Sequence, residues 1–452
     1  MTHQVTGADG GEEVSTSRVA SAGRPLVSKS LARSLLTNES MLPAVLGVAF
    51  ATTSATAGLT LRDLLAEVSE HAPQLLAQDE AILAARAGVA VAGAWEDPLF
   101  SVMIEDVALR RDPAGPMEPM LTYKLSQPLN LFGRRGLAKE AASGRLSREE
   151  AVRRRVDLDG RFEATMAFYD LWMNQEMRAL LDRQIATLER MKASAKAQYE
   201  AGLMMGHHDF LRAEAEIAAM QAERASLADQ RGAAAAMLEA LRGRAPGAST
   251  PTVALSAPAP IPEGAFVAEH ARDRPELEAL RAMRFEASAE RSLAKRMYLP
   301  MIMAGAMFQQ RLGIEPNSIG GEVALTIPLF FWDRQAHEVE IAEAMLRRAE
   351  RELEAMTRMT EAQARGAWSR ARAADRALRS LDDVALPRMR ESVASSESAY
   401  ASGAGNFLSL LDVVLSLQGL EARRIRTFAE REVAVFDLQR LLGTAALEGA
   451  RP

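Results

Sequence analysis

The sequence predicts a mainly α-helical protein with a smaller β portion, built from two similar halves. Three observations lead to this prediction: an internal repeat displaced by about 200 residues, short segments in which apolar and polar residues alternate, and long stretches with helical spacing of apolar residues. Of the 452 residues, 48% are hydrophobic but only 5% are aromatic, a composition typical of long packed helices.

The N-terminal region is predicted to direct export. Residues 41–51 are apolar, Arg33 precedes them, and the sequence ATA at 55–57 offers the small residues of a cleavage site. We expect residues 1–57 to be an N-terminal extension with a signal peptide; a short buried helix is the alternative. No other run approaches the roughly 18 apolar residues of a transmembrane helix, so any membrane-spanning part is expected to consist of strands.

Two pairs of aligned segments define the repeat. The sequence LSQPLNLFGR at 125–134 aligns without a gap with LTIPLFFWDR at 325–334, and YEAG at 199–202 corresponds to YASG at 400–403. We therefore divide the chain into a first repeat, a linker rich in proline and alanine, a second repeat and a tail, at residues 58–243, 244–268, 269–443 and 444–452.

Each half is expected to contribute one helix and two strands before its long helices. In the first half, a helix from Leu61 to about Trp95 is stopped at Pro98. Strands with one apolar face are predicted where apolar residues alternate with polar ones: Phe100, Val102 and Ile104; Leu121, Tyr123 and Leu125; and, in the second half, Val323, Leu325 and Ile327. Residues 301–308 are apolar on both faces and form the least distinct of the four predicted strands.

Long helices are predicted to follow the strands. No proline occurs between Pro128 and Pro246. A helix over 137–200 would be about 100 Å long, and a second over 335–400 is expected to be interrupted at Pro387. Apolar positions in the first stretch recur in the manner of a coiled coil: Met166, Met173, Met177, Leu180, Leu188, Met191 and Ala195.

The four strands have the length of tilted membrane-crossing strands, which is about 9–11 residues. Four strands cannot close a barrel, and lipid does not tolerate open strand edges. If the strands cross a membrane, other copies of the chain must complete the barrel.

This order of strand pair, long helix, turn and returning helix, repeated twice, resembles the TolC-like outer-membrane efflux family over about residues 59–443. The resemblance also rests on PLNLFGRR at 128–135, PLFFWDR at 328–334 and the two YxxG turns. The sequence WEDP at 95–98 and the WDR after the last strand are most similar to the heavy-metal branch of that family.

The resemblance implies a homotrimer in the outer membrane, with a shared twelve-stranded β-barrel and an α-helical barrel crossing the periplasm. It also implies docking on a periplasmic adaptor and an inner-membrane resistance-nodulation-division (RND) pump, no cofactor and no catalysed reaction. We expect passive export of substrate delivered by the pump, with heavy-metal cations as the predicted cargo. The alternatives are a duct for drugs or other organic compounds, or a soluble coiled-coil scaffold.

The resemblance places the turns of the long helices at the periplasmic tip, where the duct is constricted and the adaptor docks. Glycine at Gly202 and Gly403 suits such turns. Asp209 and Asp412 are candidates for a cation-attracting ring of carboxylates, although Asp209 is equally well explained as a first-turn acid. Tyr400 matches a tyrosine that holds the tip closed, whereas Gly405 stands where some relatives carry a partner arginine.

Other candidate sites have simpler structural readings. His208, together with Met204, Met205 and His207, is a weak candidate for a soft-metal site; a solvated or adaptor-facing tip is the preferred interpretation. The methionines at 297, 301, 303 and 307 are expected to pack within strands, and Arg134, Arg135 and Arg334 to supply charge where the chain leaves the membrane.

Several classes of protein are excluded by composition and motifs. The net charge of −6 offers no basic surface for nucleic acid. The absence of cysteine excludes disulfides and thiolate metal sites. The sequence contains neither a glycine-rich phosphate-binding loop nor an HExxH motif, so no motif of this kind indicates an enzyme.

Overall fold

The structure is a computed structural model, and it describes residues 58–107, 119–200, 207–245, 247, 252–255, 257–312 and 316–443. The expected signal peptide and the predicted C-terminal tail lie outside the described residues. No helix in the described ranges is long and apolar enough to cross a lipid bilayer.

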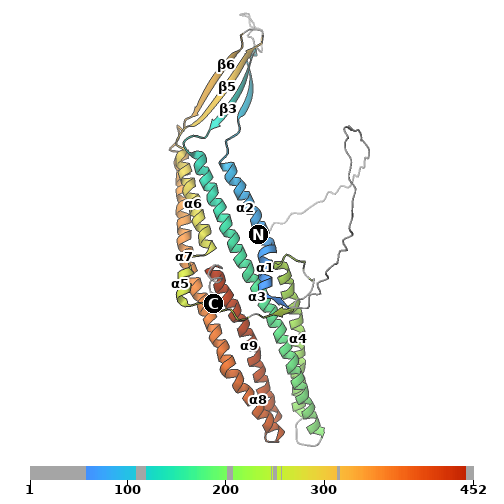
Figure 1. Cartoon of the computed structure of the whole chain (residues 1–452). Coiled ribbons are helices and arrows are strands. Elements are labelled where there is room, and N and C mark those ends of the chain that lie inside the picture. The colour runs from blue at the N-terminus through green and yellow to red at the C-terminus, as the bar shows by residue number, and fades with distance from the viewer. Residues whose placement is uncertain are drawn as a thin grey trace, which may run out of the picture. The chain divides into compact units, whose positions relative to one another are not determined.

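The first half of the chain contains two strands between short and long helices (Figure 1). Its elements are β1 Leu59–Thr60, α1 Leu61–His71, α2 Pro73–Ala92, β2 Leu99–Glu105, β3 Met120–Leu129, α3 Arg134–Glu200 and α4 His207–Leu241. The 67-residue α3 confirms the predicted long helix and is about 100 Å long. The helix predicted from Leu61 to about Trp95 is instead two helices, because Ala72 is extended before Pro73 and proline begins α2.

The second half repeats this order. Its elements are β4 Val253–Ala254, α5 Gly264–His270, α6 Pro275–Arg296, β5 Met301–Arg311, β6 Ser318–Thr326, α7 Arg334–Ser380, a π-helical turn Leu381–Ala385, α8 Leu386–Ala401 and α9 Phe407–Leu442. The predicted linker contains regular structure, since β4 pairs with β1 in parallel and α5 begins at Gly264. The segment between the two halves therefore packs against the helices.

The interruption expected at Pro387 takes the form of the π-helical turn, after which the helix continues as α8. Proline lacks an N–H and its ring clashes with the carbonyl group four residues earlier. A wider π turn just before Pro387 removes the carbonyl group from that position.

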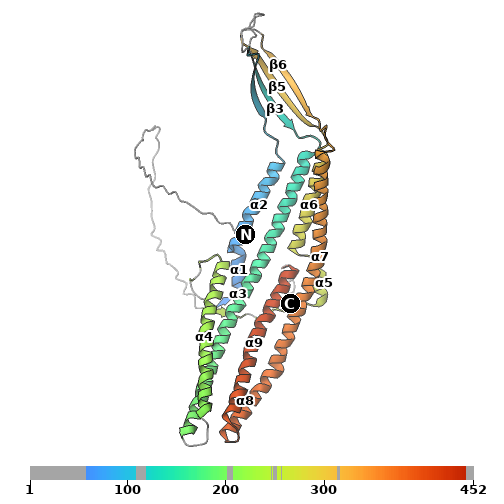
Figure 2. The ribbon, with the colours of Figure 1, turned by 180° about the vertical axis from the view of Figure 1, so that it is seen from behind.

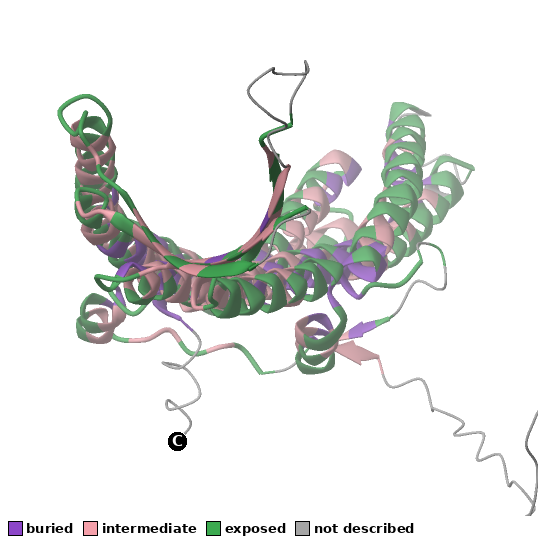
Figure 3. Ribbon diagram, turned by 90° about the horizontal axis from the view of Figure 1, so that it is seen from above, coloured by how far each residue is buried: buried purple, intermediate pink, exposed green. Residues whose placement is uncertain are grey.

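The four longer strands form one antiparallel sheet in the order β2-β3-β5-β6, which confirms the predicted four strands. The two halves meet at its centre, where β3 pairs with β5 from Met120↔Arg311 to Leu129↔Ile302. The sheet continues from one end of the long helices, as the opposite views in Figures 1 and 2 show. Figure 3, viewed from the sheet end, shows that the sheet is curved.

Three clusters of buried apolar residues hold the helices together. The largest is centred on α1, α3 and α9 and contains Phe168, Leu171 and Trp172. A second lies between α3, α4 and α9, around Leu188 and Phe407. The predicted coiled-coil positions lie in or against these clusters except Met166, which is 37% exposed.

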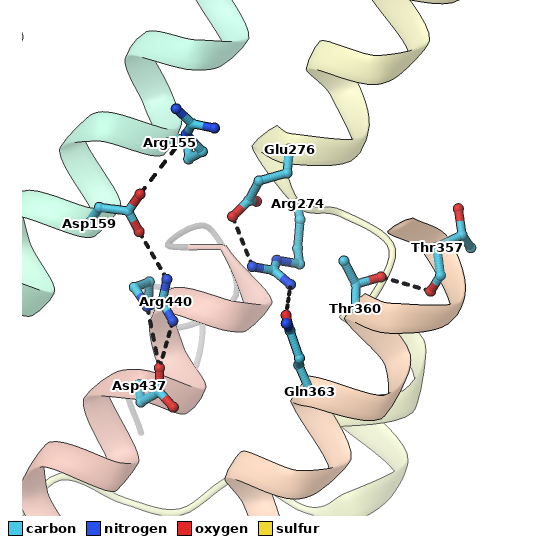
Figure 4. A network of polar contacts seen from close by, with 9 residues as sticks. All are labelled: Arg155, Asp159, Arg274, Glu276, Thr357, Thr360, Gln363, Asp437 and Arg440. Atoms are coloured by element: carbon cyan, nitrogen blue, oxygen red, sulfur yellow. Dashed lines mark hydrogen bonds and ion pairs between the residues drawn. The ribbon is translucent and has the colours of Figure 1, made fainter. Parts of the chain in front are cut away.

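Arginine and carboxylate pairs connect the helices between the clusters (Figure 4). Arg440 of α9 donates to Asp159 of α3, with Nη1 2.9 Å from Oδ1, and to Asp437. Arg274, only 3% exposed, donates to Gln363 of α7 and to Glu276 of α6. The Arg440 contact fixes α9 against α3 of the first half, whereas the Arg274 contacts join α6 to α7 within the second half.

Arg134 differs from its expected role as an interfacial charge. It is only 9% exposed, and its guanidinium donates to the carbonyl oxygens of Arg296 and Leu299, with Nη2 2.9 Å from the oxygen of Arg296. These carbonyl groups belong to the C-terminal end of α6 and the segment after it, where a cation is favourable. Arg134 thus joins the start of α3 to the end of α6.

A second buried network involves Glu432 of α9, which is 1% exposed. Its carboxylate is paired with Arg431 and accepts hydrogen bonds from the Tyr169 hydroxyl at 3.3 Å and the Ala259 N–H at 3.2 Å. Arg431 also contacts Asp375 of α7 at 3.2 Å. One carboxylate therefore connects α3, α9 and the segment between the halves.

We predict that Glu432→Ala lowers the free energy of unfolding by about 3–5 kcal/mol, because it leaves Arg431 partly unpaired in a buried site. Unfolding of the detergent-solubilised protein, followed by circular dichroism, measures the change. Glu430→Ala is the matched control, since Glu430 is exposed on the same helix. Equal stability of the two variants would contradict this role of Glu432.

Burial raises the pKa of Tyr169, and the charge of Glu432 raises it further. The neutral hydroxyl is thus favoured in the folded state, and its contribution to stability is present below pH ~10, the usual tyrosine pKa, and is lost as the pH rises above it. We predict that the free energy of unfolding of the unsubstituted protein falls between about pH 10 and 12, by up to about 1.4 kcal/mol per pH unit from this group. Tyr169→Phe should show a shallower decline, and an unchanged slope would contradict the prediction.

Candidate functional site

The helix hairpins turn at the end of the molecule opposite the sheet (Figures 1 and 2). In the first hairpin, α3 ends at Glu200 and α4 begins at His207; Gly202, Met204 and Met205 lie between them, outside the described residues. In the second, α8 ends at Ala401 and α9 begins at Phe407. We call the ends of these two hairpins the tip.

The second turn depends on two glycines with different roles. Gly403 has a φ of 77°, the left-handed conformation that glycine adopts readily. At Gly405 a Cβ atom would lie 3.1 Å from the backbone nitrogen of Tyr400, so the close approach of the two backbone segments favours glycine. Asn406 then caps α9 by accepting a hydrogen bond from the Ser409 N–H at 2.7 Å.

Tyr400 connects the two hairpins at the tip. Its ring packs edge-on against Phe407, with 6.2 Å between ring centroids, and it lies against the buried cluster that contains Leu188 of α3. Burial raises the pKa of Tyr400 and the charge of Asp209 raises it further, while a hydrogen bond with Ser194 lowers it. Tyr400 of α8 therefore interacts with both helices of the first hairpin.

Asp209 lies in the first turn of α4 and is 7% exposed. Its Oδ1 is 3.1 Å from Nε2 of His208, a contact whose angles do not make a hydrogen bond, and this oxygen has no hydrogen-bond partner among the described residues. Asp209 shares its helix face with buried Ala213 and Ile217. Within one chain, this position fits an acid in the first helical turn.

Asp412 differs from Asp209, because it is exposed on α9 immediately after buried Leu411. His208 is also exposed, with 72% of its side chain accessible, and the side chain of His207 lies outside the described part of the chain. No group of three or more His, Cys, Asp or Glu residues in the described ranges is arranged to hold a metal ion.

The sheet has one apolar and one mixed polar face. Paired residues share a face, so the register assigns Phe100, Leu125, Ala306 and Gly321 to one side. Large apolar residues on this face are exposed in the single chain: Phe100 62%, Val102 51%, Ile104 61%, Leu125 52%, Ile319 83%, Val323 72% and Leu325 54%. We call it the apolar face.

The opposite face carries Ser101, Thr122, Ser126, and an ion pair of 2.5 Å between Lys124 Nζ and Glu322 Oε2. Thr122 and Ser126 are only 5% and 3% exposed, and because side chains are more crowded on the inside of a curved sheet, we infer that this face is the concave one. The predicted alternation is therefore confirmed. The sequence left residues 301–308 undecided, and the pairing of β5 with β3 settles which of their side chains share each face.

Exposed aromatic residues gather where the sheet joins the helices. Leu329, Phe330, Phe331 and Trp332 follow β6 and are 65%, 70%, 48% and 61% exposed. The Arg135 guanidinium lies 4.3 Å from the centre of a Trp95 ring at the same junction. Aromatic rings next to cationic groups are typical of the boundary between lipid and water.

Comparisons with known proteins agree with this arrangement. One relative, the nickel-cobalt-cadmium resistance protein NccC of Alcaligenes xylosoxydans xylosoxydans, is 25% identical over 317 residues, which are 69% of this chain and 70% of that protein. The solved structure of CusC matches with a TM-score of 0.74 at 16% identity, over 85% of this chain and 92% of CusC. The outer membrane protein VceC of Vibrio cholerae matches with a TM-score of 0.73 at 17% identity, over 85% of this chain and 96% of VceC.

The solved structures show that the fold, long helical hairpins joined to four antiparallel strands, is that of TolC-like channels. The model of the outer membrane efflux protein family matches residues 64–244 and again 268–444. The match covers most of the chain and recurs in each half. The chain therefore belongs to the outer membrane efflux protein family, whose members are channels and not enzymes, with strands in the outer membrane and helices in the periplasm.

Proposed function

We propose that three copies of this chain form a duct that passively exports heavy-metal cations, delivered by an RND pump through a periplasmic adaptor. The trimer is proposed from a single observation, the open edges of the sheet. Its edge strands β2 and β6 have no neighbour within the described part of the chain, and its apolar face is suited to lipid. Lipid cannot satisfy unpaired backbone groups, and three copies supply twelve strands that close the wall.

Exposed apolar residues on the helices support the same assembly. Leu76, Leu83 and Val91 of α2 are 54%, 52% and 75% exposed. Ile341 and Met359 of α7 are 59% and 55% exposed. Residues of this kind on two separate helices are expected to be covered by neighbouring copies, which would extend the duct as a helical barrel.

The cargo is proposed from similarity to NccC, a nickel-cobalt-cadmium resistance protein. Asp412 fits this cargo, because three exposed carboxylates at the tip would attract cations to the duct. The tip residues Gly202, His208 and Gly403 are proposed to line the constriction or contact the adaptor. An organic cargo is the competing proposal, since a duct selects mainly by size and charge.

The cargo can be tested by deleting the gene and measuring tolerance to metals and organic toxicants. We expect tolerance to nickel, cobalt, cadmium, zinc or copper to fall at least several-fold, with unchanged tolerance to organic compounds, because export of the metal stops. Complementation with the intact gene is the control. Sensitivity confined to organic compounds would contradict the metal assignment.

The tip can be tested by measuring conductance of the purified protein in planar lipid bilayers. We predict that Tyr400→Ala raises the conductance several-fold, because it removes the ring that packs against Phe407 and joins the second hairpin to the first. Tyr400→Phe is the matched control, since it keeps the packed ring and loses only the hydroxyl. Equal conductance of Tyr400→Ala and the unsubstituted protein would exclude Tyr400 from closure of the tip.

A further inference from the structure

Every methionine of the four-stranded sheet lies on the concave polar face. The register places Met103 opposite Thr122, Met120 opposite Arg311 and Met307 opposite Lys124. Met301 and Met303, four and two residues before Gly305, share that face. We call these five residues the methionine track: Met103, Met120, Met301, Met303 and Met307.

This distribution is not the one that packing in lipid would produce. Within the four strands of this sheet, all isoleucine, valine, phenylalanine and tyrosine residues lie on the apolar face, and of the leucines only Leu99, paired with Ser126, lies on the polar face. Methionine is as apolar as these residues in packing terms, yet it is absent from the apolar face. The property that separates methionine from them is its thioether sulfur.

The methionine track runs along the sheet from the helix end toward the far end. Counted from the helix end of β5, Met301 and Met303 are the first two residues on this face, Gly305 is the third and Met307 is the fourth. Met103 and then Met120 occupy the next two positions, on β2 and β3. Successive positions on one face of a strand are about 7 Å apart, within reach of neighbouring long side chains. Met103 is farther from Met307, because β3 lies between β2 and β5 and each strand adds about 5 Å.

The position without methionine is occupied by Glu322 and Ser126, on either side of Gly305. Glu322 neutralises Lys124, the cationic neighbour of Met307, at 2.5 Å. A cation on the middle of the track would therefore meet sulfur and carboxylate oxygen rather than an unpaired ammonium group. Arg311, beside Met120, lies at the far end of the strand.

Several of these sulfur-bearing side chains are accessible from the concave side. Met103 and Met301 are 48% and 37% exposed. Met307 lies across Gly320, where an added Cβ atom would be 3.1 Å from its Cγ and 3.5 Å from its Sδ. Glycine at 320 thus leaves the space that the Met307 side chain occupies along the wall.

We propose that the methionine track binds Cu(I) or Ag(I) and passes these soft monovalent cations along the inner wall of the duct. Thioether sulfur is a neutral, soft ligand that selects Cu(I) over harder divalent ions such as Ni(II) or Co(II). A row of weak sites lets an ion enter and also leave, as conduction requires. This inference rests on the proposed duct and adds soft monovalent cations to its cargo.

The proposal is tested by equilibrium dialysis of the purified full chain against Ag(I) in detergent, with bound silver measured by mass spectrometry. The track variant replaces all five methionines by leucine, which preserves size and apolarity. The control variant is Met237→Leu with Met345→Leu, since both residues are exposed, on α4 and α7, and away from the sheet. We expect the track variant to bind at least tenfold less silver than the unsubstituted protein and the control variant.

Equal silver binding by the track variant, or no silver binding by the unsubstituted protein, would overturn the proposal. Circular dichroism and size-exclusion chromatography check that the track variant folds. Should it misfold, the double variant Met301→Leu with Met303→Leu decides, because it leaves three methionines unchanged and should lose a measurable part of the bound silver. Full retention by that double variant would overturn the proposal in its turn.

Tolerance assays in the deletion strain separate this inference from the proposed function. We expect the track variant to restore nickel tolerance but to leave silver tolerance at least several-fold below that given by the unsubstituted gene. Full restoration of both would overturn the track and keep the metal duct. If the unsubstituted gene restores no metal tolerance, the proposed cargo fails, and the role of the track in export fails with it.

Discussion

The antiparallel pairing of β3 with β5 is the contact on which the rest of the architecture depends. It is the one place where a strand of the first half meets a strand of the second within the described sheet. Its register, from Met120↔Arg311 to Leu129↔Ile302, aligns the apolar residues of both hairpins on one face. A shift by one residue would move the apolar residues of one hairpin to the opposite face.

The same pairing brings the helices of the two halves together. α3 leaves the sheet directly after β3, and α6 arrives directly before β5. Arg134 joins them at the sheet, and Glu286 of α6 continues the contact, paired with Arg145 and Arg148 of α3 at 2.9 Å each. Gly144 permits this approach, since a Cβ atom there would lie 2.9 Å from the backbone nitrogen of Glu286. The helices are therefore positioned by polar contacts and small residues as well as by apolar clusters.

Periodicity predicted the elements well because it is a local property. The two-residue alternation of Phe100, Val102 and Ile104 needs no partner to be recognised, and neither does the proline-free stretch that becomes α3. The features that the sequence missed depend on distant residues. Arg134 is buried because the carbonyl groups of Arg296 and Leu299 lie beside it, and no local pattern reveals a contact between residues so far apart in the chain.

The residues of the candidate site also differ in how far the sequence alone could predict them. The turn glycine at 403 was predictable, and its φ of 77° agrees with that reading. The burial of Asp209 was not predictable, because a first-turn acid and a lumen-facing acid have the same sequence signature, and its exposed fraction of 7% depends on residues distant in the chain. The methionines at 301, 303 and 307 were likewise undecided until the pairing with β3 fixed their face.

A passive duct requires weak interactions at two places, between the cargo and the wall of the sheet and between the two helix hairpins at the tip. It has no energy source of its own, so an ion that bound tightly to the wall would block the path. Neutral thioether groups, spread along the strands, satisfy this condition better than a closed cluster of carboxylates or imidazoles. At the tip, Tyr400 packs against Phe407 of its own hairpin, a contact that contributes about 0.5–1.5 kcal/mol beyond the area that it buries. Tyr400 also packs against the cluster that contains Leu188 of the first hairpin, so the two hairpins are joined mainly by apolar contacts rather than by charge.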